Sequence, residues 1–257
     1  MKALSRCAWW RPVLIIGVLM AGPTRADPAK HFCEVPAYLL TSESSLPKVQ
    51  AAVKPGGKLN VLVIGSRSSV IGLSDHSAAY PSRLQAYLGD RLPGVTIEVA
   101  LELQVKKTAE EMAPTLGKLV EERKPDLVIW QTGTVDAMHQ VDGDDFRNAL
   151  DDGVAAMQKA GTDVILMNLQ YSPRTETMIS GSAYLDNMRV VAQQHDVPLF
   201  DRFAIMRQWN ENGDFDLFSP APGMELAKRV HDCLGRALSA FVIETAHIKT
   251  ADLRIQR

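Results

Sequence analysis

Short apolar runs that alternate with amphipathic segments constrain this chain more than any other feature of its sequence. Five runs rich in β-branched or bulky apolar residues predict strands, at residues 59–64, 95–101, 126–130, 163–168 and 197–200. Five segments with helical character follow them, at residues 80–92, 108–123, 144–160, 184–195 and 224–243. Strands that alternate with helices indicate a parallel sheet covered on both faces. We therefore predict an α/β three-layer sandwich with a central five-stranded parallel sheet.

The first 26 residues have the order of a secretory signal peptide. Basic residues precede an apolar run at residues 13–21, and small residues lead to an expected cleavage site after Ala26. A membrane anchor needs roughly 20 apolar residues, whereas Pro23 ends this run sooner. We expect a periplasmic or secreted protein that has no membrane attachment after cleavage.

The rest of the chain divides into an arm, a domain and a tail. Residues 27–57 predict an N-terminal arm, because they contain four prolines and end in the turn signal Gly56-Gly57. Residues 58–245 contain all the predicted strands and helices, so they form the domain. Residues 246–257 predict a polar C-terminal tail.

Two cysteines remain after removal of the signal peptide, namely Cys33 and Cys233. An even pair in an oxidising compartment predicts a disulfide, and the alternative is two unrelated buried thiols. The formal net charge of −2 gives no basis for binding nucleic acid. Because no His, Cys, Asp and Glu residues have the spacing of a metal site, we expect no metal and no cofactor.

The loops after the strands are where a ligand is expected, because parallel sheets bind ligands beyond the carboxyl ends of their strands. The first of these loops, residues 65–72, reads Gly-Ser-Arg-Ser-Ser-Val-Ile-Gly. Such a turn can expose a nucleophile or bind an anion through its backbone N–H groups. Its glycine spacing does not fit a dinucleotide-binding fingerprint, and it is not a phosphate-binding loop because no Gly-Lys-Ser/Thr follows.

Several segments together resemble the SGNH (GDSL-type) hydrolases, in an exported bacterial branch. They are LNVLVIGSRSS at residues 59–69, the helix start at Tyr80-Pro81, PDLVIWQTGTVDAM at residues 125–138, and the stretch before Cys233. The resemblance implies a flavodoxin-like fold and ester hydrolysis. It also implies a serine nucleophile after the first strand, oxyanion donors after the second and third strands, and an Asp-x-x-His pair near the C-terminus.

This chain departs from that pattern at each catalytic position. Arg67 stands where the nucleophilic serine is expected, and a guanidinium has no hydroxyl that could form an acyl-enzyme. Residues 101–104 contain no glycine, and Val135 replaces the oxyanion asparagine, a loss that typically costs about 10²–10³ in turnover. Residues 218–225 contain no histidine, and Asp216 followed by Ser219 is the nearest relic of the Asp-x-x-His pair.

The histidines offer no clear replacement for the missing base. His231 is expected inside the last helix next to Asp232, and adjacent helical residues point in different directions. His76 follows the serine-rich turn and is the candidate that could reach it. The others outside the predicted helices are expected to be solvated, namely His31, His139 and His247.

Polar residues after the first and third strands form the predicted ligand site, namely Ser66, Arg67, Ser68, Gln131, Gly133 and Asp136. Within it, Arg67 supplies a fixed positive charge that can bind a carboxylate or phosphate through two hydrogen bonds. Trp130 is expected in the core. Arg202 and Trp209 follow the fifth strand and either close one side of the cleft or pack at the surface, and we favour the surface.

These residues support two functions. The first is an exported, hydrolase-like protein that is catalytically impaired or inactive and binds a small acyl, sugar or anionic ligand, either a small molecule or a glycan. The alternative is an active acyl or acetyl ester hydrolase that uses Ser66 or Ser68 as nucleophile and His76 as base. A third reading is a periplasmic partner of another protein, but the sequence identifies no such protein. The choice between the inactive, ligand-binding protein and the active hydrolase depends on whether a base reaches the serine-rich turn.

Overall fold

The computed structural model describes residues 32–72, 76–218 and 224–254. The predicted signal peptide, His31 and Ser219 lie outside the described residues. Cys33 and the residues after it form one compact unit. No helix in the described ranges has the length and apolar character needed to cross a bilayer.

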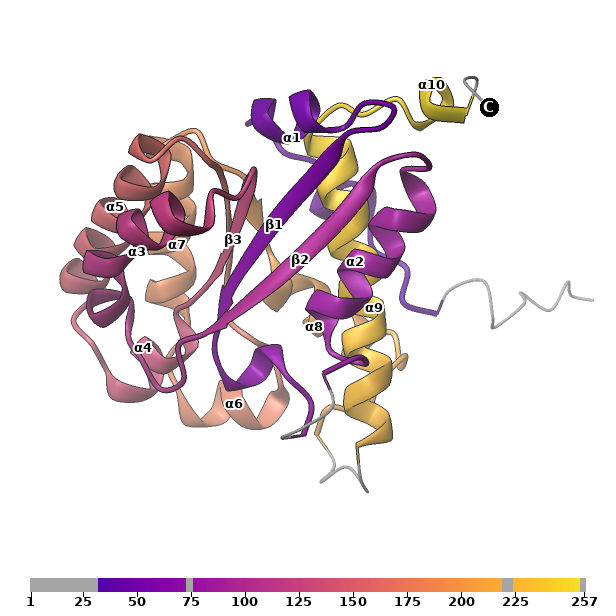
Figure 1. Ribbon diagram of the computed structural model, residues 1–257. Helices are drawn as coiled ribbons and strands as arrows, with labels where there is room; N and C mark the ends of the chain where they lie inside the picture. The colour runs from indigo at the N-terminus through magenta and orange to yellow at the C-terminus, as the bar shows by residue number, and fades with distance from the viewer. Residues whose placement is uncertain (1–31, 73–75, 219–223, 255–257) are drawn as a thin grey trace, which may run out of the picture. The chain divides into compact units, whose positions relative to one another are not determined.

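The predicted strands form one parallel sheet in the order β2-β1-β3-β4-β5 (Figure 1). Their bounds are β1 Lys58–Gly65, β2 Thr96–Leu103, β3 Leu127–Gln131, β4 Asp163–Met167 and β5 Leu199–Phe200. Every residue of β3 and β4 is buried, as expected for central strands covered on both faces. The strand that follows β1 in sequence lies on one side of it, and the later strands lie on the other side, so the strand order has a switch point between β1 and β3. Ligands bind at such a switch point in open parallel sheets.

Helices cover both faces of this sheet, which confirms the predicted three-layer sandwich (Figure 1). One face carries α3 Ala109–Arg123, α5 Gly143–Lys159 and α7 Ser182–Gln194; the other carries α2 Tyr80–Arg91, α8 Arg202–Glu211 and α9 Glu225–Thr245. The sequence analysis did not expect α8. It also missed shorter helices at α1 Pro47–Ala52, α4 Thr134–His139, α6 Pro173–Met178 and α10 Thr250–Arg254.

The core between β3 and α5 contains the fully buried side chain of Trp130, as the sequence predicts. The indole fits because α5 has a glycine opposite it. A Cβ atom on Gly153 would lie 2.6 Å from the Trp130 ring, closer than real Cβ atoms approach other atoms. Trp130 is therefore a packing residue and takes no part in the site at the strand ends.

The predicted arm packs against the sheet and helices from Cys33 onward. The carboxylate of Asp163, at the start of β4, accepts hydrogen bonds from the backbone N–H groups of Lys48 and Val49 in α1, at 2.8 and 3.0 Å. A disulfide joins Cys33 to Cys233 in α9, which confirms the predicted pair. This segment is therefore attached to the domain at two points, by the hydrogen bonds from α1 to Asp163 and by the disulfide to α9.

Candidate functional site

The serine-rich turn begins directly at the end of β1. Residues Arg67–Ser69 form a 3-10 turn, closed by a hydrogen bond from the Ser69 N–H to the Ser66 carbonyl at 2.9 Å. Gly65 is required before it, because a Cβ atom there would collide with the Ser69 hydroxyl. The turn thus places Ser66 and Ser68 at the switch point of the sheet.

Gln131 at the end of β3 ties this turn together. Its Nε2 atom donates to Ser66 Oγ at 3.2 Å and to Ser68 Oγ at 2.9 Å. Its Oε1 atom accepts from Ser69 Oγ at 2.8 Å and from the hydroxyl of Tyr80 at 2.9 Å. The structure therefore brings three predicted site residues together, namely Ser66, Ser68 and Gln131. In this network both serine oxygens accept hydrogen bonds from the amide, and no hydrogen bond joins either hydroxyl to a base among the described residues, as a nucleophilic serine requires.

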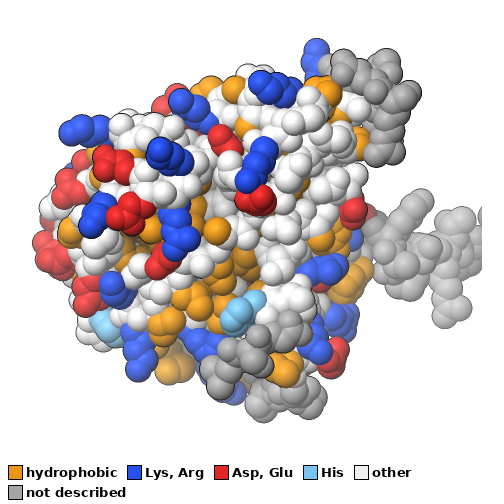
Figure 2. All heavy atoms as spheres, viewed as in Figure 1, with side chains coloured by type: hydrophobic (Ala, Val, Ile, Leu, Met, Phe, Trp, Pro, Cys, Tyr) orange, Lys and Arg blue, Asp and Glu red, His pale blue; other side chains and the backbone are white. Residues whose placement is uncertain are grey.

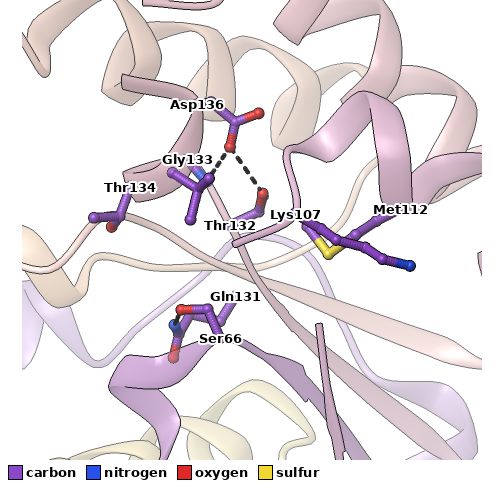
Figure 3. Close-up of a pocket in the computed structure, with 9 residues that line it drawn as sticks. Ser66, Lys107, Met112, Gln131, Thr132, Gly133, Thr134 and Asp136 are labelled. Carbon is purple, nitrogen blue, oxygen red and sulfur yellow. Dashed lines mark hydrogen bonds between the residues drawn. The ribbon is translucent and has the colours of Figure 1, made fainter. Parts of the chain in front are cut away.

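Ser66 lines a cavity of about 10 Å³, which has room for about one water molecule (Figure 3). The wall also contains Lys107, Met112 and residues 131–136. Val135 contributes to this wall at the position where the resemblance implies an oxyanion asparagine. Valine donates no hydrogen bond from its side chain, so the cavity lacks that donor.

Asp136 borders the same cavity, but its carboxylate is hydrogen-bonded to Thr132 and Gly133 and lies apart from Ser66 and Gln131 (Figure 3). One oxygen accepts from the backbone N–H of Ala109 at 2.7 Å, and the other accepts from the N–H of Gly133 at 3.1 Å. Burial raises the pKa of Asp136, and these N–H donors oppose the rise. The carboxylate thus joins the first residues of α3 and α4.

Gly133 has a backbone conformation that glycine tolerates best. Its φ angle is +92°, and a Cβ atom would lie 2.6 Å from Leu169 Cδ1. The glycine therefore lets the chain turn from β3 into α4 against the loop after β4.

A larger cavity of about 210 Å³ contains Ser68 in its wall. Arg202 of α8 and His231 of α9 line it as well, together with residues 170–172 of the loop after β4, and apolar residues of α8 and α9 complete much of the wall. On the face shown in Figure 2, apolar side chains gather toward the carboxyl ends of the strands, whereas charges of both signs cover α3, α5 and α7.

His231 is the residue that the sequence analysis placed in the last helix and set aside. It lies in α9, and its Nδ1 atom accepts a hydrogen bond from the backbone N–H of Tyr80 at 3.0 Å. Burial and the nearby charge of Arg202 lower the pKa of His231 to about 4. The neutral ring carries its proton on Nε2, because Nδ1 is an acceptor. Although His231 shares a cavity with Ser68, its remaining nitrogen is a donor and not a base.

The neighbour of His231 is engaged elsewhere, as the sequence analysis expected for adjacent helical residues. Asp232 accepts a hydrogen bond from the Tyr87 hydroxyl at 2.9 Å and pairs with the guanidinium of Arg83. No acid among the described residues is hydrogen-bonded to the His231 ring. The imidazole therefore lacks the orienting carboxylate of a catalytic triad.

The low pKa of His231 predicts a loss of stability in acid. His231 binds a proton near pH 6.5 in the unfolded state and only near pH 4 in the folded state. The stability that depends on its neutral ring is therefore complete above pH 6.5 and is lost as the pH falls toward 4. Between these values the free energy of unfolding should fall by about 3 kcal/mol more in the natural chain than in His231→Gln. Urea unfolding of both proteins from pH 7 to pH 4 measures this difference. Parallel pH curves would contradict it.

Two other predicted site residues point elsewhere. The exposed side chain of Arg67 donates from Nη1 to the Gly72 carbonyl at 2.8 Å and lines neither of the two cavities described above. Nδ1 of His76 is buried and has no hydrogen-bond partner within the described ranges. No hydrogen bond in the structure joins the His76 ring to Ser66 or Ser68.

The expectation that Arg202 and Trp209 pack at the surface is wrong, because both side chains are buried. Arg202 is 1% exposed and Trp209 is 0% exposed. Trp209 donates from Nε1 to the Glu34 carbonyl at 3.1 Å and packs edge-on against Phe215. Both residues belong to α8, the helix that sequence reasoning missed, so their burial could not be expected without it.

The fold and the site together define a protein of the SGNH (GDSL-type) hydrolase superfamily. The sheet order, the serine-rich turn after β1 and the Gly-Thr block after β3 occupy the expected places. The model of the non-GDSL lipase-like family matches residues 32–248, so the chain belongs to that family. No curated protein sequence matches the chain.

Solved structures of esterases and lipases share this fold. A lipase/acylhydrolase from Enterococcus faecalis is 19% identical with a TM-score of 0.55, covering 70% of this chain and 94% of that chain. A two-domain esterase active on acetylated mannans is 14% identical with a TM-score of 0.63, covering 81% and 56%. The esterase EstA from Pseudoalteromonas, inhibited by monoethylphosphonate, is 17% identical with a TM-score of 0.53, covering 70% and 96%. At these identities the likeness shows the fold alone.

Proposed function

We propose that this chain is an exported family member that has lost ester hydrolysis and binds a small acyl, sugar or anionic ligand at the carboxyl edge of its sheet. One observation carries the proposal. The Gln131 amide nitrogen donates to both Ser66 and Ser68, and no imidazole nitrogen of the described residues accepts a hydrogen bond from either hydroxyl. With Arg67 and Val135 at the aligned catalytic positions, neither the attacking group nor the oxyanion donor is present.

Export rests on two independent features. The N-terminal sequence has the order of a signal peptide, and the chain contains a disulfide between Cys33 and Cys233. Disulfides persist in oxidising compartments and are rare in the cytosol of ordinary cells. We therefore place the mature protein in the periplasm or outside the cell.

Ester hydrolysis by Ser68 is the alternative function. It is favoured by the shared cavity of Ser68 and His231, and by the esterase and acylhydrolase activities named for structures of the same fold. Against it stands the hydrogen bond from the Tyr80 N–H to Nδ1 of His231. Because Nδ1 is the acceptor, the proton of the neutral ring is on Nε2, and Nε2 cannot act as the base for Ser68. The same relatives support an acyl group or an acetylated sugar as the ligand of a non-catalytic protein.

Turnover of a short-chain ester distinguishes the two functions. We expect the natural chain and the Ser66→Ala/Ser68→Ala variant to hydrolyse p-nitrophenyl acetate at the same rate, near that of buffer. The reason is that removal of two hydroxyls without an adjacent base removes no catalytic step. The measurement is the initial rate of hydrolysis as a function of protein concentration, for both proteins, at pH 7 and 8.

A gain-of-hydroxyl variant provides the matched control. Arg67→Ser restores a serine at the aligned nucleophile position, and it should remain as slow as the natural chain because no base reaches the turn. A natural-chain rate that exceeds the double variant tenfold or more would establish serine chemistry and contradict the proposed function.

A further inference from the structure

The side chain of Arg202 is buried, and two of its guanidinium nitrogens have no hydrogen-bond partner among the described residues. Its Nε and Nη2 atoms are inaccessible to water and make no hydrogen bond to any described residue. Burial lowers the pKa of Arg202 to about 10, so the group still carries its charge at neutral pH. Two other arginines show the usual arrangement, since Arg83 pairs with Asp232 and Arg189 with Asp201. An unpaired buried charge is costly, so its persistence in a fold calls for an explanation.

Arg202 lines the cavity of about 210 Å³ that also contains Ser68 and His231. No Asp or Glu of the described chain lines this cavity. The nearest carboxylate in sequence, Asp201, accepts hydrogen bonds from Asn168 at 2.7 Å and from Arg189 at 3.3 Å. Among the described residues, the cavity wall therefore has one fixed positive charge and no carboxylate to neutralise it.

Gln170, Tyr171 and Ser172 add polar groups to the wall, and its apolar part determines what kind of anion fits. Met206 of α8 and Leu226, Val230 and Leu234 of α9 present apolar surface to the same space. Apolar walls with a few placed polar groups are typical of sites for small organic ligands. A strongly hydrated inorganic anion would leave this apolar surface without a partner, whereas a carbon chain would cover it.

We propose that this cavity binds a carboxylate that carries an apolar tail, with the Arg202 guanidinium as its counter-ion. The guanidinium in the cavity wall supplies the positive charge that a carboxylate needs, and the tail packs against the α8 and α9 side chains. Ser68, which lines the same cavity, can donate a further hydrogen bond. The inference rests on the proposed function, because a carboxylate bound here is a ligand and not an ester to be cleaved.

Calorimetric titration with octanoate tests this site in the full mature chain. Octanoate should bind the natural protein, while octan-1-ol, which has the same tail without the charge, should bind at least about tenfold more weakly. Arg202→Met keeps the volume and removes the charge, so it should weaken octanoate binding on the order of tenfold to a hundredfold. Arg202→Lys keeps the charge and should retain part of the affinity. Circular dichroism checks that each variant is folded.

Arg207→Met is the matched control, because Arg207 lies on the same helix, pairs with Glu211 at the surface and does not line this cavity. It should bind octanoate as the natural chain does. Equal affinity of octanoate and octan-1-ol, equal affinity in Arg202→Met, or stronger binding of sulfate would each overturn the carboxylate site. If Arg202→Met fails to fold, the comparison of octanoate with octan-1-ol in the natural chain decides alone.

Failure of this site and failure of the proposed function are distinguishable. Octanoate binding that depends on Arg202, together with serine-dependent ester turnover, would contradict the loss of catalysis and leave the site intact. Absence of octanoate binding in a chain that also lacks turnover would overturn the site alone.

Discussion

Replacing Cys33 and Cys233 together with alanine is expected to lower the free energy of unfolding by about 5 kcal/mol. The bond links residues separated by 200 positions, so it closes almost the whole domain into one loop and restricts the unfolded chain strongly. Both cysteines are 3% exposed, and the bond holds the N-terminal segment against α9. Chemical unfolding of the oxidised natural protein and of the double variant measures the difference.

A reductant supplies the control for this prediction. Dithiothreitol should lower the stability of the natural chain toward that of the double alanine variant, and it should leave the variant unchanged because no bond remains to be reduced. Equal unfolding curves for oxidised natural chain and variant would show that the bond adds nothing to stability.

Trp130→Ala is expected to destabilise the domain by about 3–5 kcal/mol, the usual cost of deleting a large aromatic side chain from a core. The indole is 0% exposed and packs in the cluster between the sheet and helices α3, α5 and α7. Its Nε1 atom has no hydrogen-bond partner within the described part of the chain, so the loss is one of packing and not of polar contacts. Thermal and urea unfolding measure it.

Met138→Ala is the matched control on the neighbouring helix α4. Its side chain is 61% exposed, so its removal should change stability by less than about 0.5 kcal/mol. A Trp130→Ala protein as stable as the control would contradict the placement of the indole in the core and reopen its role at the ligand site.

The sheet could be predicted from the sequence because its signal is local. Runs such as residues 127–130 and 164–167 are short, continuous and apolar, and each is bounded by polar residues. Helices with one wide apolar face, such as α5, follow the same rule. By contrast, α4 and α6 have only six residues each, too few to show a helical period.

The site could be predicted only in part because its contacts join distant segments. The serine-rich turn and Gln131 were found, since both lie at the carboxyl ends of strands. The hydrogen bond between Tyr80 and His231 spans 151 positions, and the burial of Arg202 depends on a helix that was not expected. A helical signal was present for His231, because it lies four residues after Ala227 and three before Leu234 and so shares their face.

Covalent labelling of the serine-rich turn tests the central claim, the absence of an activated serine, most directly. An activated serine attacks an organophosphate even when ester turnover is too slow to follow, because one reaction per molecule suffices. After incubation with diethyl p-nitrophenyl phosphate, intact-protein mass spectrometry should find the natural chain at its unmodified mass, while an active serine esterase treated alongside gains the diethylphosphoryl group. A stoichiometric adduct mapped to Ser66 or Ser68 would contradict the account.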